Sequence, residues 1–211
     1  MVESDLYGHV FFEEAPPPPL KAQDDGGLVI YAGSFSKMVV PGFRIGWLVA
    51  PRAAIAPLTA AKMLTDICTA GISQRVVAEF MGGGHLDPHL AALRRGCRIR
   101  RDRLVAALRE SCPELRFRIP SGGYYLWAQL PPPLTARYLT PAATEAGVAV
   151  RPGSHFTLDG GGDDHLRLCF AAVDPRRITL GVRRLAGALR QARRSIDAAQ
   201  RRGPRVPLSI V

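Results

Sequence analysis

Two apolar segments that flank a tight turn dominate the first quarter of the sequence. The segment LVIYAGSFS, residues 28–36, begins with branched apolar residues and is typical of a buried strand, and RIGWLVAP, residues 44–51, is typical of a second strand. Pro41 and Gly42 lie between the two segments and favour a tight turn. We therefore expect two neighbouring strands, with the turn bringing Arg44 back towards the end of the first strand.

The rest of the chain changes from helical to strand-like patterns. The alanine-rich stretch from Arg52 to about Met81 predicts helix, and the segment from His85 to Cys112 predicts one long helix. After it we expect a helix near TPAATEAG and short strands in RFRIP, GGYYLWAQL, VAVRPGSHF and HLRLCFA. The predicted domains are residues 1–84 for an α/β part, 85–112 for a linking helix, 113–200 for a small α+β domain and 201–211 for a frayed tail.

Basic residues give the chain a formal net charge of +10 and a sequence pI near 10.2. Many of them lie in the last predicted helix, opposite an apolar stripe formed by Ile178, Val182, Leu185 and Leu189. This pattern is typical of a solvated helix face, and no zinc-finger spacing or other DNA-reading motif accompanies it. The sequence therefore predicts neither a nucleic-acid site nor a metal site within these residues.

Composition and cysteine usage indicate a folded protein of the cytoplasm. Of the 211 residues, 47% are hydrophobic and 22% are charged, which is typical of a folded chain. The four cysteines form no CxxC pair, and no apolar run approaches the roughly 20 residues that a membrane-spanning helix needs. We expect a soluble cytoplasmic protein with no membrane partner.

Lys37 is one of only three lysines in a chain that otherwise uses arginine for positive charge. Arginine stays protonated in proteins, whereas a desolvated lysine can lose its proton and act as a nucleophile. Lys37 lies in the segment SFSK, at the end of the first predicted strand. An ordinary surface lysine is one interpretation, and two catalytic interpretations compete with it.

One catalytic interpretation is serine acylation through the S-x-x-K motif that Ser34 and Lys37 form. That chemistry needs both residues on one helix. Here the motif follows a predicted strand, and Pro41 with Gly42 interrupts any helix within a turn of Lys37. The companion S-D-N and K-T-G elements are missing from the sequence, which disfavours acylation.

The other catalytic interpretation is a Schiff base between Lys37 and pyridoxal phosphate. This cofactor needs an amine at a strand end, hydroxyls and a cation for its phosphate, and an anion for its pyridine nitrogen. Ser34, Ser36 and Arg44 lie within one strand, turn and strand around Lys37. Their hydroxyls and guanidinium can therefore converge on a phosphate group.

Four segments of the chain carry a resemblance to a known family. SFSK followed by PGFRIGW, with Arg44 seven residues after Lys37, resembles the cofactor-lysine segment of class I and II aminotransferases, which are fold-type I pyridoxal-phosphate enzymes. ESDLYG, PSGGYYLWAQLP, and VAVRPGSHF with GGGDDHLRLCFA resemble three further segments of that family in the same order. Within the family, the chain resembles the aminoadipate and kynurenine aminotransferases and the aminotransferase-like domain of MocR-type regulators.

The resemblance implies a role for each matching residue. Lys37 would bind the cofactor covalently and carry a proton between the substrate and the cofactor. Tyr7 would donate a hydrogen bond to the phenolic oxygen of the cofactor. The phosphate would be held by Ser34, Ser36 and Arg44.

For Arg167, the resemblance implies a bidentate pair with the α-carboxylate of an amino acid, a geometry that lysine cannot offer. Strand alternation in HLRLCF places His165, Arg167 and Cys169 on one face, with apolar neighbours opposite. An ordinary surface arginine is the alternative interpretation.

The acid that would pair with the pyridine nitrogen is ambiguous in the sequence. In most relatives the carboxylate lies three residues before the tyrosine, where this chain has Ser4, whereas Asp5 lies two residues before Tyr7, as in some MocR-type domains. A serine cannot keep the nitrogen protonated. We assign the role to Asp5, because we expect Glu3, the other nearby acid, to point away from the same strand face.

The resemblance implies an α/β fold: part of the large pyridoxal-phosphate-binding domain, with a mixed and mainly parallel sheet, followed by a small α+β domain. It implies transfer of an amino group between an amino acid and a 2-oxo acid, in a homodimer. The N-terminal half of the family's large domain has no counterpart here, so we expect a truncated chain.

Two alternative functions stay open at this point. The first is the effector domain of a MocR/GntR-type transcriptional regulator, which would contact nucleic acid only through an N-terminal DNA-binding domain. The second is a degenerate fragment that binds nothing.

Overall fold

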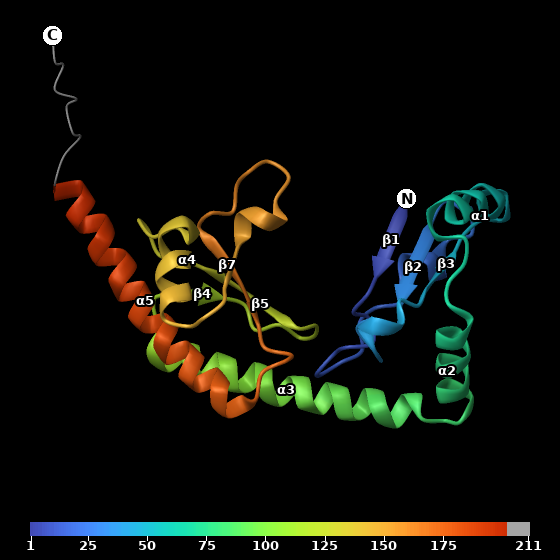
Figure 1. Ribbon diagram of the computed structural model, residues 1–211, viewed down its shortest axis with the longest axis horizontal. Helices are drawn as coiled ribbons and strands as arrows, with labels where there is room; N and C mark the ends of the chain where they lie inside the picture. Colours follow the sequence, from blue (N-terminus) through green and yellow to red (C-terminus); the bar gives the residue numbers. More distant parts are fainter. Residues whose placement is uncertain (202–211) are drawn as a thin grey trace, which may run out of the picture. The chain divides into compact units, whose positions relative to one another are not determined.

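The computed structural model describes residues 1–201 (Figure 1). The chain divides into two compact units, the first formed by Met1–Arg98 with Ser121–Gly123, the second by Ile99–Pro120 and the chain from Tyr124 onwards. Apart from Arg201, which ends the last helix, the predicted tail lies outside the described residues. The predicted domain limits stay a prediction.

The first unit contains a three-stranded sheet in the order β1-β2-β3. β1 pairs with β2 in parallel, and β2 pairs with β3 in antiparallel register, with Ser34 opposite Gly46, so the sheet is mixed. The two strands expected around the Pro41-Gly42 turn are confirmed as β2 and β3. The elements of this unit are β1 (Val2–Asp5), η1 (Leu20–Gln23), β2 (Ile30–Ser34), η2 (Pro41–Phe43), β3 (Gly46–Val49), α1 (Arg52–Asp66), α2 (Gly71–Gly82) and the first part of α3 (Leu86–Ser111).

The helix predicted from Arg52 to about Met81 is interrupted, so this prediction was wrong in one respect. α1 ends at Asp66, and α2 begins at Gly71. Of the four intervening residues, Ile67, Cys68 and Thr69 are weak helix formers and only Ala70 is a strong one, and Ile67 adopts a positive φ of 59°. The break is therefore consistent with local helix propensity. By contrast, the long helix predicted over residues 85–112 is present as α3.

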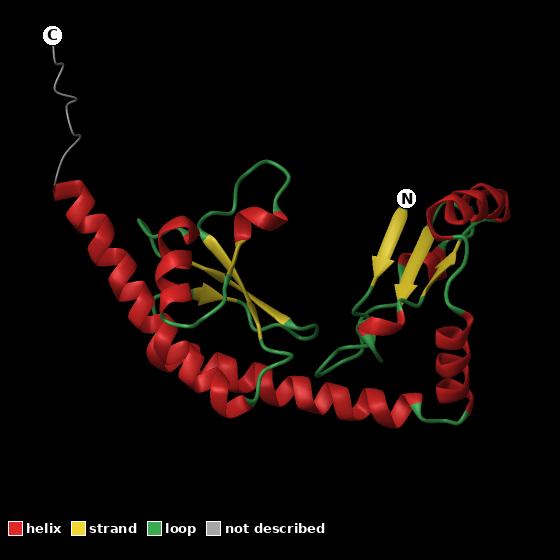
Figure 2. Ribbon diagram, viewed as in Figure 1, coloured by secondary structure: helices red, strands yellow, loops and turns green. Residues whose placement is uncertain are grey.

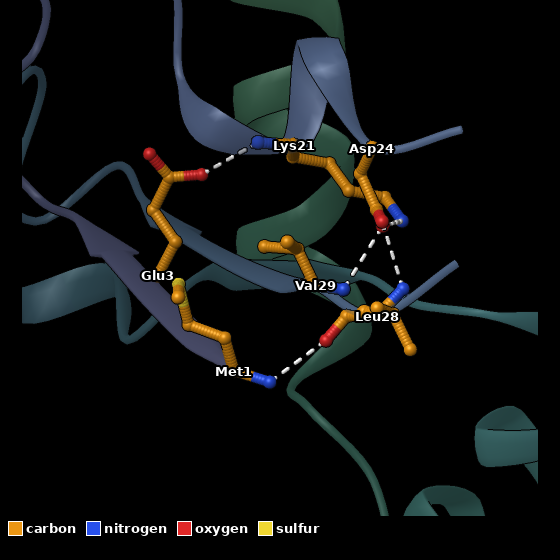
Figure 3. Close-up of polar contacts among 6 residues, drawn as sticks. All are labelled: Met1, Glu3, Lys21, Asp24, Leu28 and Val29. Atoms are coloured by element: carbon orange, nitrogen blue, oxygen red, sulfur yellow. Dashed lines mark hydrogen bonds and ion pairs between the residues drawn. The ribbon is translucent and has the colours of Figure 1, made fainter. Parts of the chain in front are cut away.

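A network of polar contacts joins the loop after η1 to the residues just before β1 and β2 (Figure 3). The Asp24 carboxylate accepts hydrogen bonds from Lys21 Nζ (2.7 Å) and from the backbone N–H groups of Leu28 (2.8 Å) and Val29 (2.9 Å). The Met1 nitrogen donates to the Leu28 carbonyl at 2.7 Å. The Lys21 hydrogen bond is the main reason that the pKa of Asp24 falls from 3.8 to about 2, and the two backbone hydrogen bonds lower it further.

We expect Asp24→Asn to remove stability that depends on pH. Because the pKa of Asp24 is lowered on folding, its carboxylate stabilises the protein fully above its ordinary pKa of 3.8, and this contribution disappears as pH falls towards about 2. The free energy of unfolding, measured in urea at several pH values, should be lower for the variant at pH 6 and should converge with wild type between pH 4 and pH 2. Asp25→Asn, at the exposed neighbouring acid, is the control. Equal stability of wild type and Asp24→Asn at pH 6 would contradict the prediction.

The second unit is built on a four-stranded antiparallel sheet in the order β4-β5-β7-β6 (Figure 2). One face of β5 and β7 is buried, with Leu126, Ala128 and Leu166 each fully covered. Its elements after α3 are β4 (Arg116–Phe117), β5 (Tyr125–Gln129), α4 (Ala136–Glu145), β6 (Arg151–Pro152), η3 (Gly153–Phe156), β7 (His165–Cys169) and α5 (Pro175–Arg201).

α5 is the predicted basic helix, and it packs against α4. The stripe predicted from Ile178 to Leu189 is confirmed as buried, with Leu189 only 1% exposed. The strand expected in VAVRPGSHF is reduced to Arg151–Pro152 and continues as the 3-10 helix η3. Pro152 has no backbone N–H for the ladder, which explains why the strand ends there. Among the described residues, no helix has the length and apolar character needed to cross a membrane.

Candidate active site

Lys37 lies in a tight turn that begins where β2 ends. The backbone N–H of Val39 donates to the Phe35 carbonyl at 2.8 Å, and the N–H of Phe35 donates to the Ile45 carbonyl at 3.1 Å. Ser34 is the last residue of β2, so Ser34 and Lys37 do not share a helix. The geometry expected for serine acylation through S-x-x-K is therefore not formed.

The three residues predicted to hold a phosphate come together around this turn. The hydroxyl of Ser34 donates to the Ile45 carbonyl (3.2 Å) and accepts a hydrogen bond from the backbone N–H of Ser36 (3.1 Å). Nη1 of Arg44 donates to Oγ of Ser36 (3.4 Å) and to the Pro41 carbonyl (3.2 Å). The contacts form a continuous chain from β2 across the turn to the start of β3.

Arg44 has a backbone conformation that non-glycine residues seldom adopt. Its φ of 56° and ψ of 37° lie in the left-handed region, directly after the short helix η2 at Pro41–Phe43. Such strained residues are concentrated at functional sites, where the surrounding structure holds them. The conformation directs an exposed guanidinium back towards Ser36.

His89 of α3 holds the Lys37 turn through a hydrogen bond. Nε2 of His89 lies 2.8 Å from the Met38 carbonyl, and because a carbonyl only accepts, this nitrogen carries the proton. The His89 ring also makes an edge-on contact with Phe80, with 5.7 Å between the ring centroids. The residue that follows Lys37 is thus held by a helix about fifty positions later in the sequence.

Asp5 ends β1, with its carboxylate bound by two donors. The backbone N–H of Gly8 donates to Oδ1 at 2.7 Å, and the hydroxyl of Tyr31 donates to Oδ2 at 2.9 Å. The pKa of Tyr31 is raised to about 12, mainly by burial and further by the Asp5 hydrogen bond and charge. Tyr31 therefore keeps its proton at neutral pH and acts as a donor.

The prediction that Glu3 points away from the strand face of Asp5 was wrong. Glu3 and Asp5 are two residues apart in β1 and therefore share a face, as their common half-buried state shows. Glu3 is instead engaged by η1, because its carboxylate accepts the backbone N–H groups of Leu20 (2.8 Å) and Lys21 (2.9 Å). Ser4 lies exposed on the opposite face. Tyr7, half-buried, lies in the loop after β1.

In the second unit, Arg167 contacts two aromatic rings. It lies on β7 opposite Trp127 of β5, and its guanidinium carbon is 4.0 Å from the ring centroids of both Tyr125 and Phe156. The Trp127 ring stacks on His165 at 5.3 Å. The alternation predicted for this strand is confirmed, with Leu166 and Leu168 buried on the other face. Both 4.0 Å distances are short enough for cation–π contacts, which leave the guanidinium N–H groups able to donate to an anion.

A family model described as aminotransferase class I and II matches residues 4–185. The chain belongs to the class I and II aminotransferase family. The resemblance found in the four sequence segments is therefore confirmed, and so is the expected fold class, because solved aminotransferases superpose on this chain with high similarity.

Among curated relatives, the 2-aminoadipate transaminase of Thermus thermophilus is 38% identical over 90% of this chain and 49% of its own length. An uncharacterized HTH-type transcriptional regulator of Bacillus subtilis is 36% identical over 90% of this chain and 39% of its own length. The solved α-aminoadipate aminotransferase of Thermus thermophilus, in complex with N-(5'-phosphopyridoxyl)-L-leucine, has a TM-score of 0.87 at 36% identity and covers 92% of this chain and 51% of its own. This chain of the aminotransferase family thus spans about half the length of these relatives, or less.

Several residues that contact the predicted site residues within each unit were not themselves predicted from sequence. Tyr31 and Gly8 hold Asp5, His89 holds the Lys37 turn, and Tyr125 and Phe156 contact Arg167. Tyr31 and His89 contact residues that are distant in sequence, and Gly8 contacts Asp5 through the conformation of the loop after β1. Only Tyr125 had a sequence signal, since it lies in the GGYYLW segment on the same strand face as Trp127.

Proposed function

We propose that this aminotransferase-family chain binds pyridoxal phosphate and belongs to an enzyme that transfers an amino group between an amino acid and a 2-oxo acid. The observation that carries the proposal is the turn after β2, where Lys37 lies among the linked Ser34, Ser36 and Arg44 side chains. The phosphopyridoxyl complex of the Thermus thermophilus relative supports the choice of cofactor.

The donors in the turn fit a dianionic phosphate. Ser36 accepts a hydrogen bond from Arg44, which leaves the hydroxyl proton of Ser36 to donate, and the exposed guanidinium has further N–H groups that can form charge-assisted hydrogen bonds. The Ser34 hydroxyl donates to Ile45 and braces the turn. In the proposal all three residues serve the phosphate: Ser36 and Arg44 donate to it, and Ser34, whose one hydroxyl proton goes to Ile45, holds the turn that positions them.

The acid at the end of β1 fits the opposite end of the cofactor. When bound, pyridoxal phosphate supplies an aldehyde that reacts with amines and a pyridine ring that accepts electrons. The Asp5 carboxylate, fixed by Gly8 and Tyr31, would hold a proton on the pyridine nitrogen. Tyr7, two residues further on, would donate to the phenolic oxygen.

Lys37 and Arg167 would act on the substrate. The Lys37 amine would first hold the cofactor and then, once released, carry a proton from the substrate Cα. Arg167, held by cation–π contacts with Tyr125 and Phe156, would donate its N–H groups to the α-carboxylate as a bidentate pair. The proposal includes a cytoplasmic homodimer that uses an amino acid and a 2-oxo acid.

A second candidate function is favoured by the relatives named as HTH-type transcriptional regulators. Two of these proteins from Bacillus subtilis match 86% and 90% of this chain, at 33% and 36% identity. In this alternative the same site would bind the cofactor and an amino acid as a signal, without repeated turnover, and contact with nucleic acid would come from a separate DNA-binding domain.

We expect Arg44→Gln to weaken the binding of pyridoxal phosphate by about tenfold or more, because a hydrogen bond to a charged group contributes about 1.5–3 kcal/mol. The dissociation constant is measured from the absorbance of the purified chain titrated with the cofactor. Arg75→Gln is the matched control, since Arg75 belongs to the same unit, is 78% exposed and pairs with Glu79. An equal loss in both variants would contradict a specific phosphate contact.

The loaded chain then separates the two candidate functions. Incubation with amino acids and a 2-oxo acid, followed by chromatography of the products, should show many amino-group transfers per chain if the protein is an enzyme. Amino-acid binding with at most one transfer per chain would favour the regulatory alternative. A well-folded wild type that binds no pyridoxal phosphate would overturn the proposal.

A further inference from the structure

We propose that Tyr31 is a positioning residue that fixes the orientation of the Asp5 carboxylate. The inference rests on the proposed function, because a fixed carboxylate matters where it must hold a proton on the pyridine nitrogen of a cofactor. Tyr31 acts through Asp5 and not by its own contact with the ligand. Tyr31 lies on β2, six residues before Lys37, and Asp5 lies at the end of β1. Their contact therefore joins the strand that leads to Lys37 to the strand that carries Asp5.

The register of the parallel pair β1 and β2 brings these two side chains together. Glu3 lies opposite Tyr31, and Asp5 lies opposite Gly33, so Asp5 and Tyr31 are diagonal neighbours on adjacent strands. A tyrosine side chain is long enough to reach the residue two positions further along the neighbouring strand. The Tyr31 hydroxyl spans this separation and lies 2.9 Å from Oδ2 of Asp5.

Each carboxylate oxygen of Asp5 has its own donor. Gly8 N–H binds Oδ1 at 2.7 Å, while the hydroxyl of Tyr31 binds Oδ2. A side chain at position 8 would collide with the carboxylate, so glycine allows this close approach. The outer torsion of an aspartate is soft, and one donor on each oxygen removes this freedom. Each oxygen also keeps a further lone pair that can accept a proton-bearing ligand group.

Tyr31 keeps its hydroxyl proton at neutral pH. Burial is the main cause that raises the pKa of Tyr31 to about 12, and the charge of Asp5 acts in the same direction. Tyr31 has a single hydroxyl proton, which points at Oδ2, so phenylalanine would keep the ring but lose the donor. Tyr31→Phe therefore tests the hydrogen bond to Asp5 without removing the aromatic ring.

A double-mutant cycle tests whether Tyr31 acts through Asp5. The dissociation constant for pyridoxal phosphate is measured for wild type, Tyr31→Phe, Asp5→Ala and the double variant. We expect Tyr31→Phe to weaken binding about tenfold when Asp5 is present, and by less than about twofold in the Asp5→Ala background. Tyr138→Phe, at a half-exposed tyrosine of α4, is the control and should bind like wild type. Equal losses with and without Asp5 would indicate a packing role and overturn the inference.

A second measurement does not require the cofactor. The ionisation of Tyr31 is followed by ultraviolet absorbance at alkaline pH, with the Tyr31→Phe spectrum subtracted. We expect the Tyr31 pKa to fall in Asp5→Ala, and an unchanged pKa would overturn the inference. If wild type binds no pyridoxal phosphate, the proposed function fails, and this titration alone decides whether Tyr31 and Asp5 form the pair.

Discussion

Lys37→Ala is expected to abolish the covalent retention of pyridoxal phosphate. After borohydride reduction, wild type should carry close to one cofactor per chain, attached at Lys37, and the variant should fall to background. The reason is that the lysine amine is the only group of the turn that can bond to the cofactor aldehyde, while Ser36 and Arg44 make reversible contacts. Mass spectrometry of the digested protein measures the label and its position.

The chain offers a matched control for this experiment. Lys62 lies on α1, is 47% exposed and pairs with Asp66 at 2.7 Å. Lys62→Ala should keep the full label, since surface lysines react weakly and without a phosphate site beside them. If Lys37→Ala kept a label equal to wild type, the assignment of Lys37 would be wrong. Circular dichroism of both variants checks that the fold is retained.

Leu166→Ala is expected to cause the largest loss of stability. Leu166 is fully buried and lies on β7, the strand between β5 and β6 in the second sheet. Truncating its side chain leaves a cavity. Such changes cost about 2–5 kcal/mol in the free energy of unfolding. Urea denaturation should show a lower midpoint with a similar slope. The effect should be structural, since Leu166 faces away from Arg167.

Cys169→Ala is the control on the same strand. Cys169 is exposed and lies on the Arg167 face, so its replacement should change stability by less than about 0.5 kcal/mol. A loss below about 1 kcal/mol for Leu166→Ala would show that β7 does not form the centre of this core. A large loss for Cys169→Ala would indicate that the alternation along β7 is not as described.

Sequence patterns predicted the local parts of the fold well, because these depend on neighbouring residues. The apolar segments around Pro41 and Gly42 became β2 and β3, and the period of α5 placed its apolar stripe in the core. The order of four segments was enough to identify the family and its fold. The break between α1 and α2 was missed, although the weak helix formers at 67–69 are visible in the sequence.

The chemistry of the candidate site follows from residue types that the sequence alone specifies. Ser34, Ser36 and Lys37 lie at the end of the first strand, and Arg44 follows the Pro41-Gly42 turn. Which acid is available, and what holds it, depends on strand register and on loops that fold back. Glu3 is taken up by η1, while Asp5 is bound by Gly8 and Tyr31. The hydrogen bond from His89 to the Met38 carbonyl likewise forms only when α3 packs beside the Lys37 turn. Except for the Gly8 contact, which is three residues from Asp5, these contacts join residues 17 to 51 positions apart. No local pattern encodes such contacts, and they appear only once the strands and helices have packed together.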